Sequence, residues 1–362
     1  MHESVKRGAD LGRLSRPLMR WVFRALLALP AVLLLRIAGQ RQRVVDDRKL
    51  DPRIQFHAWF VRHFRKPLAI SPTELRKPRL LSLYLLDGGA AQVGVEGGSI
   101  AGTGGPLRIR IYRPPNMGHR PPVLVYFHFG GCVLGDLDTC HTACTRLAAE
   151  AEAIIVSAEY RLAPEHRFPA AVEDAVTAYR WALANADKLG GDPQRIGVGG
   201  DSAGGYLAAA VCLACRDSGE PPPVLQLLIY PVTDMDRDAM PESPHDEDYP
   251  LSREDMIWFS EQYIATPADI EQPLCSISRA ASFKGLPPAL VCLAGYDVLR
   301  EEGVALARRF EADGVPVVLR IFDSLPHAFT AMCGAIPDAR HALSEISRLL
   351  REQYSNSNRK GA

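Results

Sequence analysis

The feature that most constrains the fold of this chain is a serine between glycines, placed where an expected strand meets an expected helix. The centre reads Gly200-Asp-Ser-Ala-Gly-Gly205, and the short apolar run 196–199 precedes it. The Ala-rich run 206–214 that follows favours a helix. A serine on a sharp strand-to-helix turn needs small neighbours, because larger side chains would collide with the adjoining backbone. Such turns present nucleophilic serines, so the pattern predicts chemistry as well as a fold.

The size and charge of the chain limit what it can be. Its 362 residues are enough for one large α/β domain or two ordinary ones. Acidic and basic residues balance at 42 each, so no net charge favours binding to a nucleic acid. Eight cysteines lie scattered without the spacing of a disulfide framework or a zinc site, and no metal or other cofactor is expected. Free thiols suit a reducing cytoplasm, which is the predicted location.

Residues 1–48 form a basic and apolar N-terminal extension. The apolar run 25–35 follows several basic residues, as in a signal peptide. However, Pro30 interrupts the run, no Ala-x-Ala cleavage site is present, and the run is too short to span a bilayer as a helix. We expect residues 18–38 either to pack against the rest of the chain or to make a peripheral contact with a membrane surface.

Strand and helix patterns alternate along the rest of the chain, which predicts an α/β fold with one mostly parallel sheet of about eight strands flanked by helices. Strand signals begin near Leu81, and the alternating run 107–112 indicates a half-exposed, antiparallel strand at the sheet edge. Continuously apolar strand patterns lie at 123–127, 153–157, 195–199, 225–230, 289–294 and 316–322. Helical patterns lie at about 139–151, 169–188, 202–217, 301–313 and 338–353.

Two stretches fall outside this alternation. Asp51 and Pro52 are a typical helix start, and the apolar face of the helical pattern 52–64 needs a partner. The interval 234–281 has no central-strand pattern, but it contains a second apolar helical stretch, 253–264. An insertion at the strand ends beside the serine is well placed to cover a pocket.

A serine nucleophile requires a base, which in turn is oriented by an acid. In this kind of turn the chain order is Ser, then Asp or Glu, then His. Three histidines follow Ser202. His245 precedes any acid placed after the next strand, His341 lies in the last helical pattern, and His327 follows the final apolar strand. His327 is therefore the expected base.

Asp297 is the expected acid, because it follows the strand pattern 289–294 on a short loop. Glu301, Glu302 and Asp323 are alternatives, although the two glutamates open a helix, where acids commonly interact with the helix dipole. The nucleophile, acid and base then all lie at carboxyl ends of strands, where open α/β sheets bind their ligands.

The negative oxygen formed during such a reaction needs hydrogen-bond donors. His128-Phe-Gly-Gly131 follows the apolar strand 123–127, and its glycines allow backbone N–H groups to approach that oxygen. We expect Gly130, Gly131 and Ala203 to be the donors.

Together these motifs resemble the hormone-sensitive-lipase-like family of α/β-hydrolase esterases, bacterial lipolytic family IV. The resemblance covers roughly residues 50–353. It implies a serine carboxylesterase for short- to medium-chain acyl esters, which works through an acyl-enzyme without a metal or cofactor. The matching stretches are His128-Phe-Gly-Gly-Cys-Val-Leu-Gly-Asp-Leu-Asp-Thr139, Tyr160-Arg-Leu-Ala-Pro-Glu-His-Arg-Phe-Pro-Ala-Ala171, Gly200-Asp-Ser-Ala-Gly-Gly205, Leu286-Pro-Pro-Ala-Leu-Val291, Asp297-Val-Leu-Arg300 and His327-Ala-Phe329.

The resemblance also implies a helical cap built from an N-terminal segment and the insertion after Tyr230-Pro231. Members of the family often dimerise, so a homodimer is a candidate assembly, and a small-molecule ester is the expected partner. The expected division of the chain is an extension 1–48, a first cap segment 49–80, a catalytic domain 81–233 and 282–355, and a cap insertion 234–281.

The chain departs from the family pattern in its glycine-rich loop. That loop usually reads His-Gly-Gly-Gly followed by an aromatic residue, whereas here Phe129 replaces the first glycine and Cys132 the aromatic residue. Both donor glycines remain, so the change bears on the shape of the pocket. Phe129, Cys132 and Asp201 are the expected substrate contacts. A smaller departure is Val298, which follows Asp297 where proline is usual.

Two other functions stay open at this point. One is a non-catalytic ligand-binding protein, since a fold alone does not fix a function; the presence of His327 argues for catalysis instead. The other keeps the chemistry but makes the substrate an amide or a membrane lipid.

Overall fold

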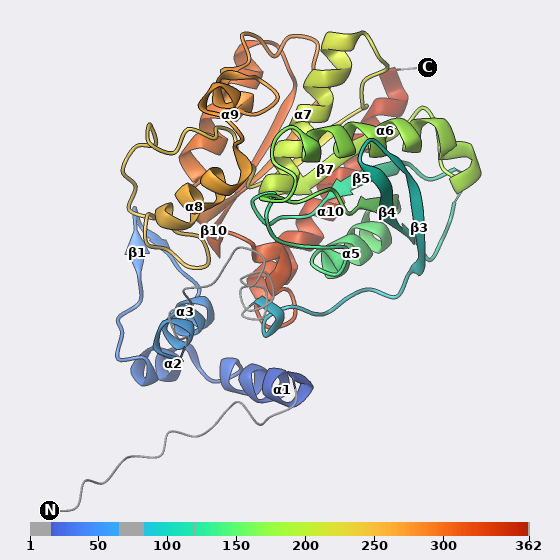
Figure 1. Ribbon diagram of the computed structural model, residues 1–362. Helices are drawn as coiled ribbons and strands as arrows, with labels where there is room; N and C mark the ends of the chain where they lie inside the picture. Colours follow the sequence, from blue (N-terminus) through green and yellow to red (C-terminus); the bar gives the residue numbers. More distant parts are fainter. Residues whose placement is uncertain (1–15, 65–82, 119, 361–362) are drawn as a thin grey trace, which may run out of the picture.

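An eight-stranded sheet runs through the middle of the molecule in the computed structural model, which describes residues 16–64, 83–118 and 120–360 (Figure 1). The strand order is β10-β9-β8-β7-β5-β6-β4-β3. Strands β10 to β6 pair in parallel, and β4 pairs antiparallel with both β6 and β3. The strands are β3 Gly94–Gly102, β4 Gly105–Arg113, β5 Val123–Phe127, β6 Ile154–Ala158, β7 Ile196–Asp201, β8 Gln226–Ile229, β9 Ala289–Tyr296 and β10 Val317–Pro326.

Helices cover both faces of the sheet, which explains why its central strands are apolar without alternation. In β5, Val123, Val125 and Phe127 pack into the core beneath α6, α7 and α9, whereas Leu124 and Tyr126 pack into the core beneath α5 and α10. The predicted helices and parallel strands are therefore confirmed. The helices are α5 His141–Ala151, α6 Ala170–Leu189, α7 Ala203–Ser218, α9 Arg300–Ala312 and α10 Pro337–Lys360.

The antiparallel edge of the sheet differs from the prediction. Leu81 lies outside the described residues, and residues 83–86 form a helical turn rather than a strand. The outermost strand is the glycine-rich β3, and the strand predicted at 107–112 is its neighbour β4, one place inside the edge. Glycine has low strand propensity, so β3 carries no sequence signal of its own. Its pairing with β4 along nine register positions defines it.

The turn between β7 and α7 depends on two glycines that lie against β5. A Cβ atom on Gly204 would overlap the carbonyl oxygen of Phe127, and one on Gly200 would overlap the backbone of Gly204. Only residues without a side chain allow the start of α7 to approach the end of β5 this closely. The approach places Ser202 at the carboxyl end of the sheet beside the loop that follows β5.

The N-terminal elements gather at one end of the molecule (Figure 1). Asp51 caps α3 by accepting a 2.7 Å hydrogen bond from the Arg53 amide, as its position predicts. The Tyr296 hydroxyl, at the end of β9, donates to the carbonyl oxygens of Arg43 and Arg48 and so holds the β1–β2 hairpin. The elements are α1 Arg16–Leu27, α2 Ala31–Ile37, β1 Val44–Val45, β2 Arg48–Lys49 and α3 Pro52–Phe64.

The segment 234–281 lies next to α3. It contains α8 Arg253–Tyr263 and the short 3-10 helices Pro267–Glu271 and Ile277–Arg279. The ring of His57 in α3 lies 5.0 Å from that of Tyr249, measured between centroids. Arg62 also donates to the Glu247 carbonyl at 2.5 Å. Helix α3 thus contacts the loop before α8, while the buried side chains of the two helices pack into different cores: those of α8 lie with α6, α7 and α9, and those of α3 lie with α5 and α10.

Within the described ranges, no single helix is long and apolar enough to cross a membrane. The pair Leu18–Leu27 and Ala31–Ile37 passes that test of length and composition only when the two helices are taken together, and they are bent by 111° at the break between them.

We expect Gly204→Ala to destabilise the fold by about 2–3 kcal/mol, because the added methyl group overlaps backbone that cannot move aside. Gly97→Ala in β3 is the matched control, since a Cβ atom there meets nothing within 4 Å, and its effect should stay within about 0.5 kcal/mol. Urea unfolding of both variants measures the difference. Equal stability of the two variants would contradict the close contact between β5 and α7.

Candidate active site

Ser202 occupies the turn between β7 and α7 in a conformation that few non-glycine residues adopt. Its backbone has φ 57° and ψ −119°, and such strain typically costs about 1–3 kcal/mol. The surroundings hold it in place: the Ser202 amide donates to the Ile229 carbonyl at 2.8 Å, and its own carbonyl accepts from the Tyr206 amide at 3.0 Å. The strained turn places Ser202 in the lining of a pocket.

His327 connects this hydroxyl to a buried carboxylate. The Ser202 Oγ lies 2.9 Å from His327 Nε2, and His327 Nδ1 lies 2.7 Å from Asp297 Oδ2. With Nδ1–H donating to the carboxylate, Nε2 is free to accept the serine proton. The other oxygen, Asp297 Oδ1, accepts from the Leu299 amide at 2.9 Å. The structure thus brings together the three residues that the sequence singled out.

The alternative acids lie elsewhere. Glu302 accepts from Arg237 Nη1 at 2.8 Å and from the Thr233 amide, also at 2.8 Å. Glu301 and Asp323 are exposed on the surface. None of the three therefore contacts His327.

Neither of the other two histidines that follow Ser202 in the sequence contacts it. His245 Nδ1 lies 2.7 Å from the carboxylate of Asp248, within the segment next to α3. His341 is exposed on α10. His327 is the histidine that meets Ser202.

A second buried carboxylate, Asp201, supports the loop that carries His327. Thr330 and Tyr230 donate their hydroxyl groups to Asp201 Oδ2 at 2.6 and 3.0 Å. The Tyr230 ring lies 4.6 Å from the His327 ring between centroids. Burial raises the pKa of Asp201, while the hydrogen bonds from Thr330 and Tyr230 act in the opposite direction. Asp201 therefore joins the nucleophile turn to the histidine loop, a role that sequence reasoning missed because the partners lie far along the chain.

The loop after β5 brings two of the expected donors to Ser202. Gly130 and Gly131 line the same pocket as Ser202 and Ala203. Within the described part of the chain, the amides of these three donors make no hydrogen bond to a protein acceptor. A Cβ atom on Gly131 would overlap the ring of Phe259, so that ring lies directly over the loop. The site has unpaired N–H groups where a negative oxygen would form.

His128 begins this loop and is fully buried. Its Nδ1 donates to the Phe129 carbonyl at 2.8 Å, its ring stacks on that of Tyr160 at 4.3 Å, and Nε2 has no partner among the described residues. Burial lowers the pKa of His128 to about 4. Since a second ring proton would be buried without an acceptor, the imidazole stays neutral at physiological pH.

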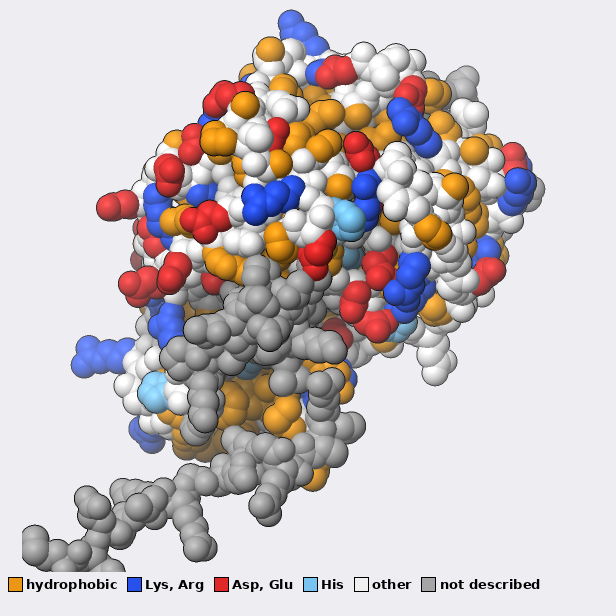
Figure 2. All heavy atoms as spheres, viewed as in Figure 1, with side chains coloured by type: hydrophobic (Ala, Val, Ile, Leu, Met, Phe, Trp, Pro, Cys, Tyr) orange, Lys and Arg blue, Asp and Glu red, His pale blue; other side chains and the backbone are white. Residues whose placement is uncertain are grey.

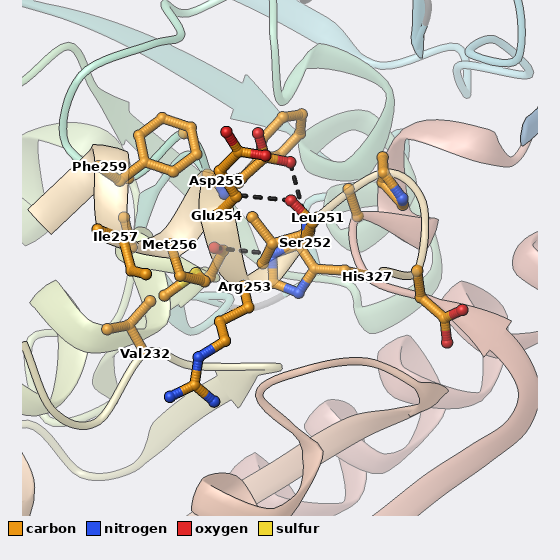
Figure 3. A pocket seen from close by; sticks show the side chains of 18 of the residues that line it. Val232, Leu251, Ser252, Arg253, Glu254, Asp255, Met256, Ile257, Phe259 and His327 are labelled. Carbon is orange, nitrogen blue, oxygen red and sulfur yellow. Dashed lines mark hydrogen bonds between the residues drawn. The ribbon is translucent and has the colours of Figure 1, made fainter. Parts of the chain in front are cut away.

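The pocket above Ser202 has a volume of about 720 Å³. Figure 3 shows the apolar side chains Val232, Met256 and Ile257 together on one side of His327. Besides Ser202 and the donors, the lining includes Arg62 of α3, Leu83, Phe129, Leu134, Arg237, residues 246–257 and Phe259.

Two of the three expected substrate contacts need correction. Phe129 lines the pocket, but Cys132 and Asp201 do not. Cys132 is fully buried beside Tyr263, and Asp201 lies behind the nucleophile turn. Both residues were expected to contact the substrate because they adjoin motif residues in the sequence, but their side chains point elsewhere. Helix α8 supplies one wall of the pocket, and the only indication of this in the sequence was the apolar helical pattern at 253–264.

Within the described ranges, no group of three or more His, Cys, Asp or Glu side chains could hold a metal ion.

Comparison with known proteins identifies the relatives of this chain. A sequence profile of the α/β hydrolase fold matches residues 124–331. Esterase LipI of Mycobacterium tuberculosis is 41% identical over 248 residues, which are 67% of this chain and 77% of that protein. Carboxylic ester hydrolase LipN of the same organism is 39% identical over 302 residues, 81% of this chain and 80% of that protein. A hyperthermophilic esterase structure from Pyrobaculum calidifontis has a TM-score of 0.74 at 36% identity, covering 82% of this chain and 96% of that one.

The parallel sheet, the serine turn and the profile match together define an α/β hydrolase. Within that class the chain belongs to the hormone-sensitive-lipase-like esterases of family IV, and it is a carboxylic ester hydrolase.

The buried His128 predicts a loss of stability in acid. The unfolded chain takes up a proton near pH 6.5, whereas the folded imidazole stays neutral down to about pH 4, so stability falls as the pH drops through that window. Between pH 7.5 and 5 this residue should cost the folded state about 2 kcal/mol.

The test measures the free energy of unfolding in urea at both pH values for the wild type and His128→Gln. The stability advantage of the wild type over the variant should shrink by about 2 kcal/mol on acidification. His341→Gln, on the exposed face of α10, is the control. A difference that does not change with pH would show that His128 is not held neutral.

Proposed function

We propose that the chain is a serine carboxylesterase in which Ser202 is the nucleophile, His327 the base and Asp297 the acid that orients it. The observation that carries the proposal is the continuous line of hydrogen bonds from Ser202 Oγ through the imidazole to Asp297. Ser202 lies in a pocket that is also lined by Gly130, Gly131 and Ala203, whose amides have no acceptor among the described residues. All three side chains are at least nine-tenths buried, so their mutual orientation is fixed by packing.

The reaction follows from this geometry. The Ser202 oxygen attacks the ester carbonyl while its proton passes to His327 Nε2, and the resulting imidazolium is stabilised by the Asp297 carboxylate. Negative charge on the former carbonyl oxygen is held by the amides of Gly130, Gly131 and Ala203. The alcohol leaves with the proton from Nε2, which gives an acyl-enzyme. Water then attacks that acyl-enzyme by the same steps and releases the acid.

The proposal extends to short- and medium-chain acyl esters as the preferred substrates. Phe129 and the apolar side chains of α8 narrow the pocket around Ser202, and the ring of Phe259 covers Gly131. An apolar wall this close to Ser202 favours acyl groups that are short enough to fit beside these rings.

Segments 49–80 and 234–281 are proposed to act together as a cap. The described contacts between them, through His57 and Tyr249 and through Arg62 and Glu247, support a joint cover over the pocket mouth. The division of the chain proposed here keeps the catalytic domain at 81–233 and 282–355. A homodimer and a cytoplasmic location remain predictions.

We expect Ser202→Ala to lose turnover of p-nitrophenyl esters by at least about 10⁴-fold, because no other group can form the acyl-enzyme. The measurement is hydrolysis of the series from acetate to palmitate, with a maximum expected at short to medium chains. Ser355→Ala, exposed on α10, is the matched control and should keep wild-type turnover.

Two results would contradict the proposal. Wild-type turnover in Ser202→Ala would exclude this serine as the nucleophile. A folded wild-type protein that is inactive across the series would instead favour a ligand-binding protein or an amidase.

A further inference from the structure

The outer surface of α1 and α2 carries an unusual concentration of exposed hydrophobic side chains. Trp21 is 68% exposed and Val32 is 62% exposed. Figure 2 shows hydrophobic side chains gathered on the end of the molecule that α1–α3 form. We call this surface the α1–α2 outer face; its members are Leu18, Trp21, Leu26, Val32, Leu33 and Ile37.

The opposite surface of the same two helices is fully packed. Phe23 of α1 contacts the rings of Phe56 and Phe60 in α3, with the Phe60 ring 4.9 Å away between centroids. Leu27 and Leu34 are buried in the same core. Arg20 and Arg24 further donate to the Asp87 carbonyl. Inner side chains thus fix the helices to the body, while the side chains of the outer face stay 37% to 68% exposed.

The charge of this segment is strongly one-sided. Residues 16–45 contain six arginines and no aspartate, glutamate or lysine, although the whole chain has a net charge of zero. Arg36 and Arg41 are exposed at the end of α2 and just after it. An apolar surface with Trp, flanked by arginines, has the composition of helices that lie at the interface of a membrane with anionic lipids.

A second copy of the chain fits this surface less well. In a two-fold dimer the same patch meets itself, so the arginines of both copies would come together without acidic partners from residues 16–45. An anionic bilayer supplies both an apolar interior for Trp21 and negative headgroups for Arg36. The 111° bend and the packed inner surface also place the helices along the membrane rather than across it.

The outer face lies close to the mouth of the pocket. Phe23 of α1 packs on Phe60 of α3, and α3 supplies Arg62 to the pocket lining. Arg62 in turn binds the carbonyl of Glu247, which also lines the pocket. A membrane held against α1 and α2 would therefore be one helix away from the entrance that leads to Ser202.

We propose that the α1–α2 outer face docks on the surface of an anionic lipid bilayer, and that docking supplies the site with acyl esters dissolved in that bilayer. The second half of this proposal rests on the esterase function proposed above. Docking itself depends only on the exposed side chains and the arginines.

The first test is sedimentation of the full chain with vesicles of phosphatidylcholine alone or with 30% phosphatidylglycerol. We expect the wild type to bind the anionic vesicles and to release them at high salt. Trp21→Ser/Val32→Ser should weaken binding by at least about tenfold, and Arg36→Gln/Arg41→Gln by roughly 30-fold. Val95→Ser and Leu319→Ser, exposed hydrophobic positions elsewhere, should bind like the wild type.

Docking is overturned if the wild type ignores anionic vesicles or if Trp21→Ser/Val32→Ser binds them as well as the wild type does. Sedimentation velocity without lipid is the second arm. If the wild type forms a dimer that this double variant loses, and neither protein binds vesicles, the face serves self-association and the proposal fails.

The second half is tested by activity. Trp21→Ser/Val32→Ser should hydrolyse soluble p-nitrophenyl butyrate at the wild-type rate but a medium-chain ester partitioned into anionic vesicles at least about tenfold more slowly. Equal rates on the vesicle ester, with binding lost, would overturn substrate delivery. Absence of wild-type activity on the soluble ester would refute the esterase function while the binding result still stands.

Discussion

The close contact between β5 and the start of α7 is the constraint on which the site depends. Because Gly200 and Gly204 carry no side chains, the helix can begin against the carbonyl of Phe127. This approach goes with the positive φ of Ser202, and it brings the Ala203 amide to the same pocket as the loop that follows β5. One backbone contact therefore places the proposed nucleophile beside the proposed donors, and the loop that carries His327 completes the site. The energy stored in the strained turn is small beside the packing of two buried helix layers.

The central architecture and the meeting of the three side chains of the proposed triad could be predicted from the sequence for a physical reason. Buried parallel strands are continuously apolar, so their ends can be located, and functional side chains at those ends meet along one edge of the sheet. Ser202, Asp297 and His327 were found in that way. By contrast, β3 consists largely of glycine and small residues and is defined only by its partner strand, a property that a local pattern cannot reveal.

Three-dimensional contacts also decided which motif residues face the pocket. Asp201 stands next to the nucleophile in the chain, yet its carboxylate turns away to Tyr230 and Thr330. Cys132 follows the donor glycines, yet its backbone turns back at φ 58° and buries the thiol. The pocket wall instead comes from α8 and the loop before it, whose apolar residues indicated only that some partner was needed. The apolar pattern indicated that these elements pack against another surface, but it could not identify that surface.

The hydroxyl of Tyr296 ties the N-terminal hairpin to the residue just before Asp297. Consequently, the anchoring of the N-terminal elements and the placement of the proposed acid both depend on one tyrosine. A motion that lifted the hairpin away from β9 would first have to break this bond. Because the backbone of Tyr296 continues directly into Asp297, a shift of the hairpin would also act on the carboxylate that His327 contacts.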